Sequence, residues 1–195
     1  MRNPSIFPTK LFLFAFSLLL AFSFQAVAAE TYKVDPVHSM TVFRIKHLVS
    51  YSYGRFNDLS GTFNIDTETP AKSSVELEVK IESVDTFNEK RDQHLKSPDF
   101  FNAKQFPVIT FKSKAVKKIN EDTYEVTGDL SLHGVTRPLT LKVEQTGAGK
   151  DPWGGYRIGF ETTFTLKRSE FGITFMPDVV GDEVRMNVSI EGIRQ

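Results

Sequence analysis

The 195-residue chain carries 24 basic and 24 acidic side chains, so its formal net charge at pH 7 is zero. This balance argues against a dedicated nucleic-acid-binding protein, whose domain is normally strongly basic. The chain has no cysteine, which excludes disulfide bonds, a catalytic cysteine and a lipid-modified cysteine at the N-terminus.

The first 28 residues have the features of a secretory signal peptide. Arg2 and Lys10 precede an apolar run at 11–24, and the small-residue sequence Ala26-Val27-Ala28 follows. We expect cleavage after Ala28. The alternative is an uncleaved membrane anchor, but the apolar run is shorter than the roughly 20 residues that a membrane-spanning helix needs. The sequence therefore predicts an exported protein whose mature part, 29–195, forms one domain with a sizeable core.

Much of the mature sequence alternates apolar and polar residues, as strands with one buried face do. In the segment 73–81, for example, Val75, Leu77 and Val79 face one side and glutamates face the other. Similar patterns or candidate strands occupy 40–48, 60–66, 73–81, 108–116, 124–133, 137–144, 156–167 and 183–192. Strands with one apolar face indicate an antiparallel sheet. We expect an all-β fold of about eight strands, either a barrel or a sandwich, and closure into a barrel is favoured because it removes exposed edges.

The passage from 87 to 105 interrupts this alternation. Thr86 and Glu89 have the spacing of a capping box, which predicts a helix that begins near Phe87. Ser97-Pro98-Asp99 then predicts the start of a second short helix, and this one carries the apolar Phe100 and Phe101. A polar helix followed by an aromatic one, inserted between two strands, suits a helical cap over one end of the barrel.

No sequence motif predicts catalysis or a metal site. Arg91 and His94 share a helical face, but Asp92 lies off that face, so the three do not form an oriented acid–base set. The histidines His38, His47, His94 and His133 lack the spacing of metal ligands. There is also no G-x-S-x-G motif and no glycine-rich phosphate loop. We therefore predict a protein that is not an enzyme and has no metal or other cofactor.

Four stretches together resemble the YceI-like family of exported bacterial proteins. They are FRIKHLVSYSYGRFNDLSGTF, SVDTFNEKRDQHLKSPDFFNAKQFPVITF, GDLSLHGVTRPLTL and DPWGGYRIGFETTFTL, and they cover almost the whole chain after residue 32. The resemblance implies an eight-stranded antiparallel barrel of lipocalin-like shape, usually periplasmic. It also implies that a long polyisoprenoid or quinone-like chain lies in the barrel of some members. No catalytic residue of the family transfers to this chain.

Twelve phenylalanines remain after residue 28. They are either ordinary core residues or part of the lining of a ligand cavity, since ligand sites are mostly apolar with a few placed polar groups. From the facing of the strands and the composition of the inserted segment, the candidate lipid-binding residues are Phe43, His47, Phe63, Arg91, His94, Phe100, Phe101, Phe111, Phe160 and Phe164. Arg91, and also His47 or His94, would meet a phosphate or quinone head group at the mouth.

Together these features predict a periplasmic carrier for a polyprenyl phosphate or a quinone. The alternatives are an accessory protein of membrane redox chemistry or stress survival that binds quinones, an enzyme on a lipid-linked substrate with His94 or His47 as base, and a filled barrel that acts through its surface. The expected partner is an isoprenoid-type lipid and not nucleic acid. The sequence does not decide whether the protein makes transient contacts with inner-membrane proteins or forms a homodimer.

Overall fold

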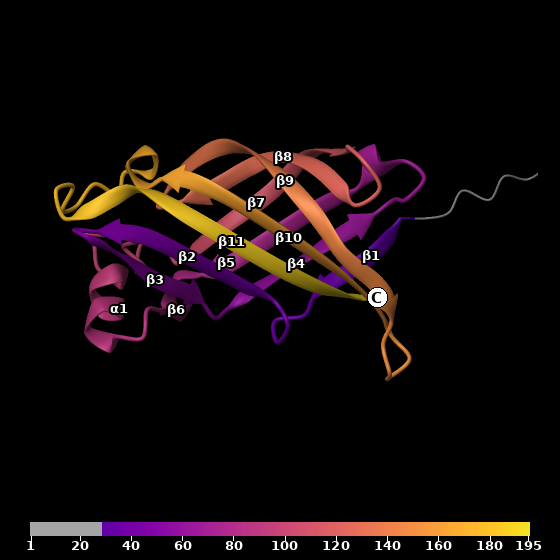
Figure 1. Cartoon of the computed structure of the whole chain (residues 1–195), viewed down its shortest axis with the longest axis horizontal. Helices are drawn as coiled ribbons and strands as arrows, with labels where there is room; N and C mark the ends of the chain where they lie inside the picture. Colours follow the sequence, from indigo (N-terminus) through magenta and orange to yellow (C-terminus); the bar gives the residue numbers. More distant parts are fainter. Residues whose placement is uncertain (1–28) are drawn as a thin grey trace, which may run out of the picture.

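The computed structural model describes residues 29–195, and the expected signal peptide lies outside the described residues. Strands dominate this part of the chain (Figure 1). They are β1 (Glu30–Val34), β2 (Met40–His47), β3 (Ser50–Phe56), β4 (Leu59–Ile65), β5 (Ser74–Lys80), β6 (Val84–Asp85), β7 (Val108–Lys118), β8 (Thr123–Leu132), β9 (Val135–Lys150), β10 (Tyr156–Lys167) and β11 (Val180–Arg194). The helices are α1 (Glu89–Lys96) and the short 3-10 helices η1 (Pro70–Lys72), η2 (Ile81–Ser83) and η3 (Arg168–Phe171).

All eleven strand segments form one antiparallel sheet, which closes on itself. One edge of β11 pairs with β10, and its other edge pairs with β1 near Gly192 and with β2 between Val180 and Ser189. β1 and β2 are therefore two halves of one long strand. The same holds for β3 with β4 and for β5 with β6, because β3 pairs with β2 and β6 while β4 pairs with β1 and β5. The eleven segments thus make a closed barrel of eight strands, which confirms the predicted fold.

Three strand segments were not among the predicted ones: β1, β3 and the two-residue β6. β3 has the sequence SYSYGRF, in which the outward tyrosines are larger than the inward Ser52 and Gly54. Its inward face is small because Phe43 lies opposite Gly54, where an added Cβ would overlap the Phe43 ring. β1 was also missed, although Tyr32 and Val34 are among the most buried side chains of the core.

The inserted segment contains one helix, not two. α1 begins one residue after Asn88, whose side chain accepts a hydrogen bond from the backbone N–H of Arg91. Asn88 is therefore the cap, and the predicted Thr86 cap is wrong. Residues 98–105 form successive turns in place of the second helix, and Asn102 lies in the left-handed region at φ 49°, which a helix cannot contain. Phe100 is nevertheless buried, as expected.

The seam between β9 and β10 is hydrogen-bonded over only part of its length. Their ladder runs from Tyr156 opposite Lys150 to Glu161 opposite Glu144 and then stops. The first half of β9 pairs only with β8, and the last residues of β10 pair only with β11. Pro138 lies in this one-sided part of β9, as is usual for a residue that has no backbone N–H to donate.

The core consists of two apolar clusters on opposite walls of the barrel. One is built on β1 to β6 with parts of β10 and β11, around Tyr32, Phe56 and Phe63. The other is built on β7 to β9 with η3 and the inserted segment, around Leu130 and Phe171. Partly buried residues such as Leu77, Phe160 and Phe164 contact both clusters and join them across the interior. No helix among the described residues has the length and apolar character to cross a membrane.

We expect Gly192→Ala to lower the free energy of unfolding by about 1–3 kcal/mol, because overpacking a core costs this much. A Cβ at Gly192 would lie 2.7 Å from Phe63 Cε1 and 3.1 Å from Tyr32 Cβ, at the point where β11 closes the barrel. The control is Gly147→Ala, since nothing lies within 4 Å of a Cβ there. Urea denaturation measures both, and equal effects of the two changes would contradict this account of the packing.

Candidate functional site

The interior of the barrel holds a cavity of about 260 Å³. Its lining is almost entirely apolar and takes side chains from both walls, from Leu95 on α1 and from Phe100 and Phe101 in the turns that follow. Along the barrel it reaches from Ile65 on β4 to Val180 at the start of β11. The volume lies just below the range of roughly 300–1,000 Å³ that is typical of ligand pockets, so the cavity suits a slender apolar chain.

Seven of the ten candidate residues lie in the cavity lining: Phe43, Phe63, Phe100, Phe101, Phe111, Phe160 and Phe164. Those on strands face inward because successive side chains of a strand alternate between the two faces of the sheet. The rings meet edge to face, for example Phe63 and Phe160 with centroids 5.7 Å apart and Phe56 and Phe101 at 5.8 Å. Phe56 also lines the cavity and was not a candidate, although the same alternation places it inward. The role of these rings as lipid ligands remains a prediction.

The three polar candidates lie outside the cavity lining. Arg91 donates from Nε to Thr86 Oγ1 at 2.8 Å and from Nη2 to the Thr86 carbonyl at 2.5 Å. Asp92 accepts from the backbone N–H of Thr86 at 2.9 Å. These contacts fasten α1 to the end of β6, so Arg91 and Asp92 have a clear structural role.

His94 and His47 do not join Arg91. His94 Nε2 lies 3.0 Å from Asp99 Oδ2, and its ring packs edge-on to Phe100 and Phe175. His47 is exposed at the end of β2. The structure therefore brings together no acid–base set from these residues, and their contact with a head group stays a prediction.

Two buried polar residues of the lining were not among the candidates. Thr41 is 5% exposed, and among residues 29–195 its Oγ1 is the one buried side-chain oxygen or nitrogen without a hydrogen-bond partner. Arg168 is 6% exposed. The alternation that places Phe43 inward also places Thr41 inward, so the sequence held a signal for it. Nothing in the sequence pattern marks Arg168 as buried.

Arg168 organises the loop between η3 and β11. Its guanidinium donates hydrogen bonds of 2.8–2.9 Å to four backbone carbonyls, those of Ile173, Phe175, Val180 and Gly181. Burial lowers the pKa of Arg168. Among the described residues no carboxylate lies within ion-pair distance of it, although the charge of Asp182 acts on it at longer range.

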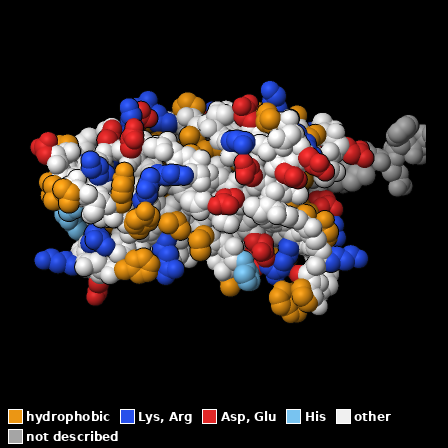
Figure 2. All heavy atoms as spheres, viewed as in Figure 1, with side chains coloured by type: hydrophobic (Ala, Val, Ile, Leu, Met, Phe, Trp, Pro, Cys, Tyr) orange, Lys and Arg blue, Asp and Glu red, His pale blue; other side chains and the backbone are white. Residues whose placement is uncertain are grey.

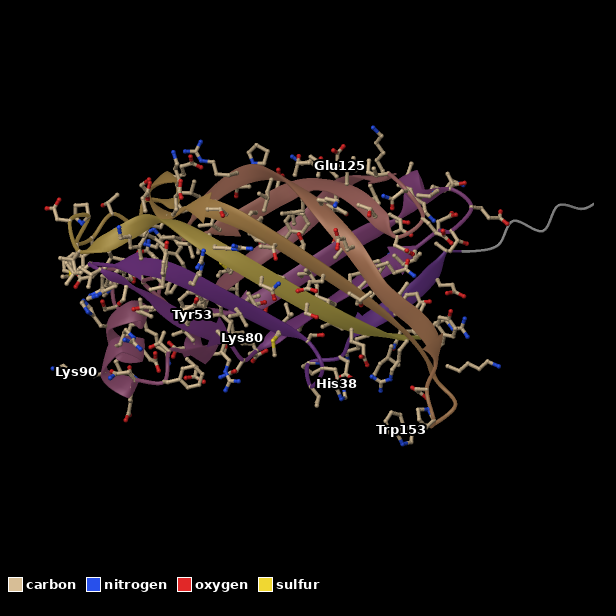
Figure 3. The ribbon with its side chains drawn as sticks, viewed as in Figure 1. His38, Tyr53, Lys80, Lys90, Glu125 and Trp153 are labelled. Carbon is tan, nitrogen blue, oxygen red and sulfur yellow. The ribbon has the colours of Figure 1, made fainter. Side chains whose placement is uncertain are left out.

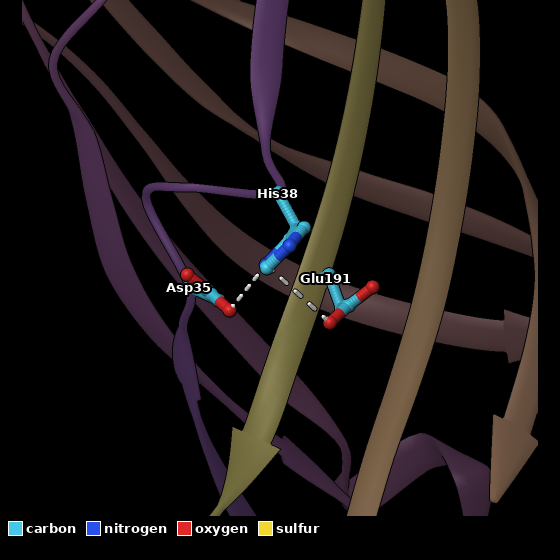
Figure 4. A group of neighbouring side chains, drawn as sticks. All are labelled: Asp35, His38 and Glu191. Carbon is cyan, nitrogen blue, oxygen red and sulfur yellow. Dashed lines mark hydrogen bonds and ion pairs between the residues drawn. The ribbon is translucent and has the colours of Figure 1, made fainter. Parts of the chain in front are cut away.

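A second polar cluster lies between β1 and β2, outside the cavity (Figure 4). His38 Nδ1 is 2.8 Å from Asp35 Oδ2 and 4.0 Å from Glu191 Oε1. The three side chains have the ligand spacing of a metal site, but Arg157 already supplies a cation there. Its Nη1 donates to Asp35 Oδ2 at 2.6 Å and to Glu191 Oε1, and its Nε donates to Asp151 at 3.0 Å. The cluster ties the break between β1 and β2 to β10 and β11.

This cluster perturbs the ionisation of Asp35. The hydrogen bond from His38, helped by bonds from Arg157 and from the backbone N–H of Val37, holds the pKa of the Asp35 carboxyl well below its usual range. The three carboxylates around Arg157 raise the pKa of its guanidinium. Both groups are therefore charged at every pH at which the protein would function.

Comparison with known proteins places this barrel in a family. A family model described as the YceI-like domain matches residues 32–192. This chain belongs to the YceI-like family. The resemblance that the four sequence stretches indicated is confirmed.

Relatives of this YceI-like chain occur in several bacteria. A UPF0312 protein of Pseudomonas aeruginosa is 47% identical over 174 residues, which cover 88% of this chain and 90% of the relative. A UPF0312 protein of Yersinia enterocolitica is 47% identical over 173 residues, which cover 87% and 89%. The chain therefore spans nearly the full length of both relatives.

Solved structures share the fold. The crystal structure of the Campylobacter jejuni YceI protein is 32% identical, with a TM-score of 0.69 over 77% of this chain and 90% of that chain. A polyisoprenoid-binding domain from Saccharophagus degradans has a TM-score of 0.66 over 84% of this chain and 98% of that chain. The second is 18% identical, so it shows likeness of fold alone.

We expect Asp35→Asn to lower the free energy of unfolding at pH 7 by about 2 kcal/mol, because charge-assisted hydrogen bonds to His38 and Arg157 are lost. The pKa of Asp35 is lower in the folded than in the unfolded protein. The stability that its ionised form contributes is thus fully present above its unfolded pKa of about 4 and is lost as the pH falls further. The difference between the two proteins should therefore shrink from about pH 4 to pH 2.

Urea denaturation at a series of pH values measures this difference. The control is Asp58→Asn, which removes the acid of an exposed pair with Lys80 and should change stability little. A difference for Asp35→Asn that stays constant down to pH 2 would show that the cluster does not depress the pKa of Asp35.

Proposed function

We propose that this YceI-like protein is a periplasmic carrier that holds a long apolar lipid of the isoprenoid type inside its barrel. The observation that carries the proposal is the apolar cavity, which lies between the two core clusters and is lined at one end by Leu95 of α1 and by Phe100 and Phe101 in the turns after it. A filled barrel that acts only through its surface would have no such space. The likeness of fold to a polyisoprenoid-binding domain supports the choice of lipid.

Burial of the chain supplies the binding energy. Each methylene removed from water contributes ~0.8 kcal/mol, so ten such groups contribute about 8 kcal/mol, the free energy that corresponds to a Kd of about 1 µM. The costs of association lower this figure, and further isoprene units raise it. Specific hydrogen bonds are therefore not needed for binding, and they would serve to select the head group.

The lining offers two groups that suit a head group. The free hydroxyl of Thr41 can donate to a quinone carbonyl, which satisfies a buried polar atom that otherwise lacks a partner. The positive charge of Arg168, which no carboxylate contacts directly, favours a phosphate, and its Nη2 donates only one hydrogen bond although it carries two N–H groups. These groups add to Arg91, His47 and His94, which would act from outside the lining.

Binding is favoured over catalysis in this proposal, because His94 and His47 lie outside the cavity lining and have no general-base geometry toward it. An accessory role in membrane redox chemistry would use the same binding step with a quinone as cargo. Export supports either role. We infer that residues 1–28 are removed during export and that 29–195 form one lipid-binding domain, consistent with the family match over 32–192.

The test is native mass spectrometry of the protein purified from the periplasm without detergent, followed by organic extraction. We expect a discrete adduct whose extract shows the repeat of isoprene units, since an apolar cavity retains such a chain during purification. A clean apo mass that persists after incubation with quinones and polyprenyl phosphates would overturn the carrier proposal.

A pair of variants ties the adduct to the cavity. Val188 on β11 lines the cavity, while the next residue, Ser189, faces outward. We expect Val188→Trp to fill the cavity and to reduce lipid adducts at least tenfold, and Ser189→Trp to leave them unchanged. Retained adducts in the Val188→Trp protein, with its circular dichroism intact, would place the lipid outside the barrel.

A further inference from the structure

Two loops meet at the end of the barrel that carries α1. The first is the β2–β3 turn at Leu48 and Val49, and the second connects η3 to β11 (Figure 1). The backbone N–H of Leu48 donates to the carbonyl of Val179 at 2.9 Å, and His47 pairs with Val180. The two loops therefore form one surface, and Figure 2 shows apolar side chains gathered at this end.

We call Leu48, Val49, Phe175 and Met176 the apolar tip. Val49 is 98% exposed and Leu48 is 56% exposed, and the two residues of the second loop are each 39% exposed. The tip is held in place: the Phe175 ring lies edge-on to Phe100 at 5.5 Å, and the Phe175 carbonyl accepts from Arg168. A protein that used this end only as a turn would not need to display four large apolar side chains there.

The backbone conformation of the tip adds to the free-energy cost of exposing these apolar side chains. Leu48 and Met176 have φ values of 48° and 52°, a left-handed conformation in which glycine or asparagine is less strained. Asparagine would also be more soluble at an exposed turn. The chain therefore accepts backbone strain at two positions where large apolar side chains point to solvent, and such strain persists chiefly where function uses it.

Cations and tyrosines lie directly behind the tip. Arg44 and Lys46 on β2 and Arg185 on β11 surround a shallow hollow on the outer face of the barrel. Within residues 29–195 none of the three forms an ion pair, and Arg44 is directly opposite Arg185, an arrangement of like charges that destabilises a sheet. The acids of the hollow are Asp182 and Glu183.

Of these two acids, Asp182 already accepts hydrogen bonds from the backbone and the hydroxyl of Ser169. Tyr51 and Tyr53 on β3 are each 53% exposed, and the Arg44 guanidinium lies 4.4 Å from the centre of the Tyr51 ring. Figure 3 labels Tyr53 on this side of the barrel. The hollow thus has an excess of positive charge and one exposed amphipathic ring, that of Tyr51, and a second ring, that of Tyr53, lies two residues further along β3.

We propose that this end of the barrel docks onto an anionic lipid bilayer, with the apolar tip inserted among the head groups. Along β3, Tyr51 and Tyr53 lie two and four residues behind Val49, or about 7 and 13 Å at the rise of a strand. Their cross-strand partners are Lys46 and Arg44. From the tip inward, apolar side chains are therefore followed by tyrosines and cations. A membrane interface is arranged in the same order, and apolar groups penetrate it by about 5–10 Å. A flat protein partner would not match this layered, convex end.

Docking in this orientation would bring the cavity to the membrane. The cavity lining reaches Ile45 and Val180, which lie close to the tip along β2 and β11. Loading or release of cargo at this end rests on the proposed carrier function, whereas the membrane contact itself does not.

The experiment is flotation of residues 29–195, which contain every described element, with vesicles of phosphatidylcholine alone or with 30% phosphatidylglycerol. We expect binding to the anionic vesicles. The double change Leu48→Asn with Val49→Asp should weaken it at least tenfold, and asparagine tolerates the left-handed conformation at position 48. Lys46→Gln with Arg185→Gln should weaken it about fivefold for each cation removed, and only with anionic vesicles.

Controls come from positions away from the tip. Val37 is 81% exposed on the β1–β2 connection, and Val37→Asp should leave binding unchanged. The single tryptophan, Trp153, lies in the β9–β10 turn, far from the tip (Figure 3), so its emission should not shift to the blue when vesicles bind. A tryptophan placed at the tip by Val49→Trp, in a Trp153→Phe background, should shift.

Failure to float with anionic vesicles, or a blue shift of Trp153 with binding unaffected by the tip variants, would overturn the proposal. The outcome is separable from that of the carrier proposal. Vesicle binding without any lipid adduct would contradict the carrier function alone, and an adduct without vesicle binding would contradict the docking surface alone.

Discussion

The pairing of β11 with both halves of its neighbouring strand is the constraint on which the rest of the structure depends. Because β1 and β2 share one edge of β11, the sheet returns on itself and its apolar face has no second layer to pack against. Inward side chains can contact only one another. With eight strands the enclosed space is just wide enough to be filled or to hold one small ligand, and here the aromatic residues of the two walls leave a cavity between them.

The sequence predicted this architecture where the alternation was clear. Strands such as β5 and β11 place large apolar residues inward at every second position, so the pattern needs no knowledge of the partner strand. β3 could not be found in this way, because its inward Ser52 and Gly54 are small, and Gly54 leaves room for the Phe43 ring on β2. The second helix failed for a related reason. Its capping sequence was real, but Asn102 turns the chain before a helix can form.

The residues of the candidate site were likewise predictable only where they lie on clearly alternating strands. The alternation of side chains along a strand correctly predicted that five phenylalanines line the cavity, Phe43, Phe63, Phe111, Phe160 and Phe164, and it would also have placed Thr41 there. The positions of the polar residues in the inserted segment could not be predicted in this way, because a helix of this composition has no apolar face that fixes which side is buried. Arg91 meets Thr86, which precedes it by five residues, and that contact depends on how the chain leaves β6. Arg168 donates to four carbonyls, two in the loop that follows η3 and two at the start of β11, and no local sequence pattern predicts these contacts.

The incomplete ladder between β9 and β10 affects how easily the wall of the barrel can open. Beyond Glu161 and Glu144 these strands share no backbone hydrogen bonds, and the contact that remains is a single bond from the Thr162 hydroxyl to the carbonyl of Lys142 at 2.8 Å. Along the β7–β8, β8–β9 and β10–β11 seams the wall can widen only by breaking a row of backbone bonds. Here the strands can part by giving up one side-chain bond and the apolar packing between them, so opening this stretch of the flank would leave every backbone ladder of the described sheet intact.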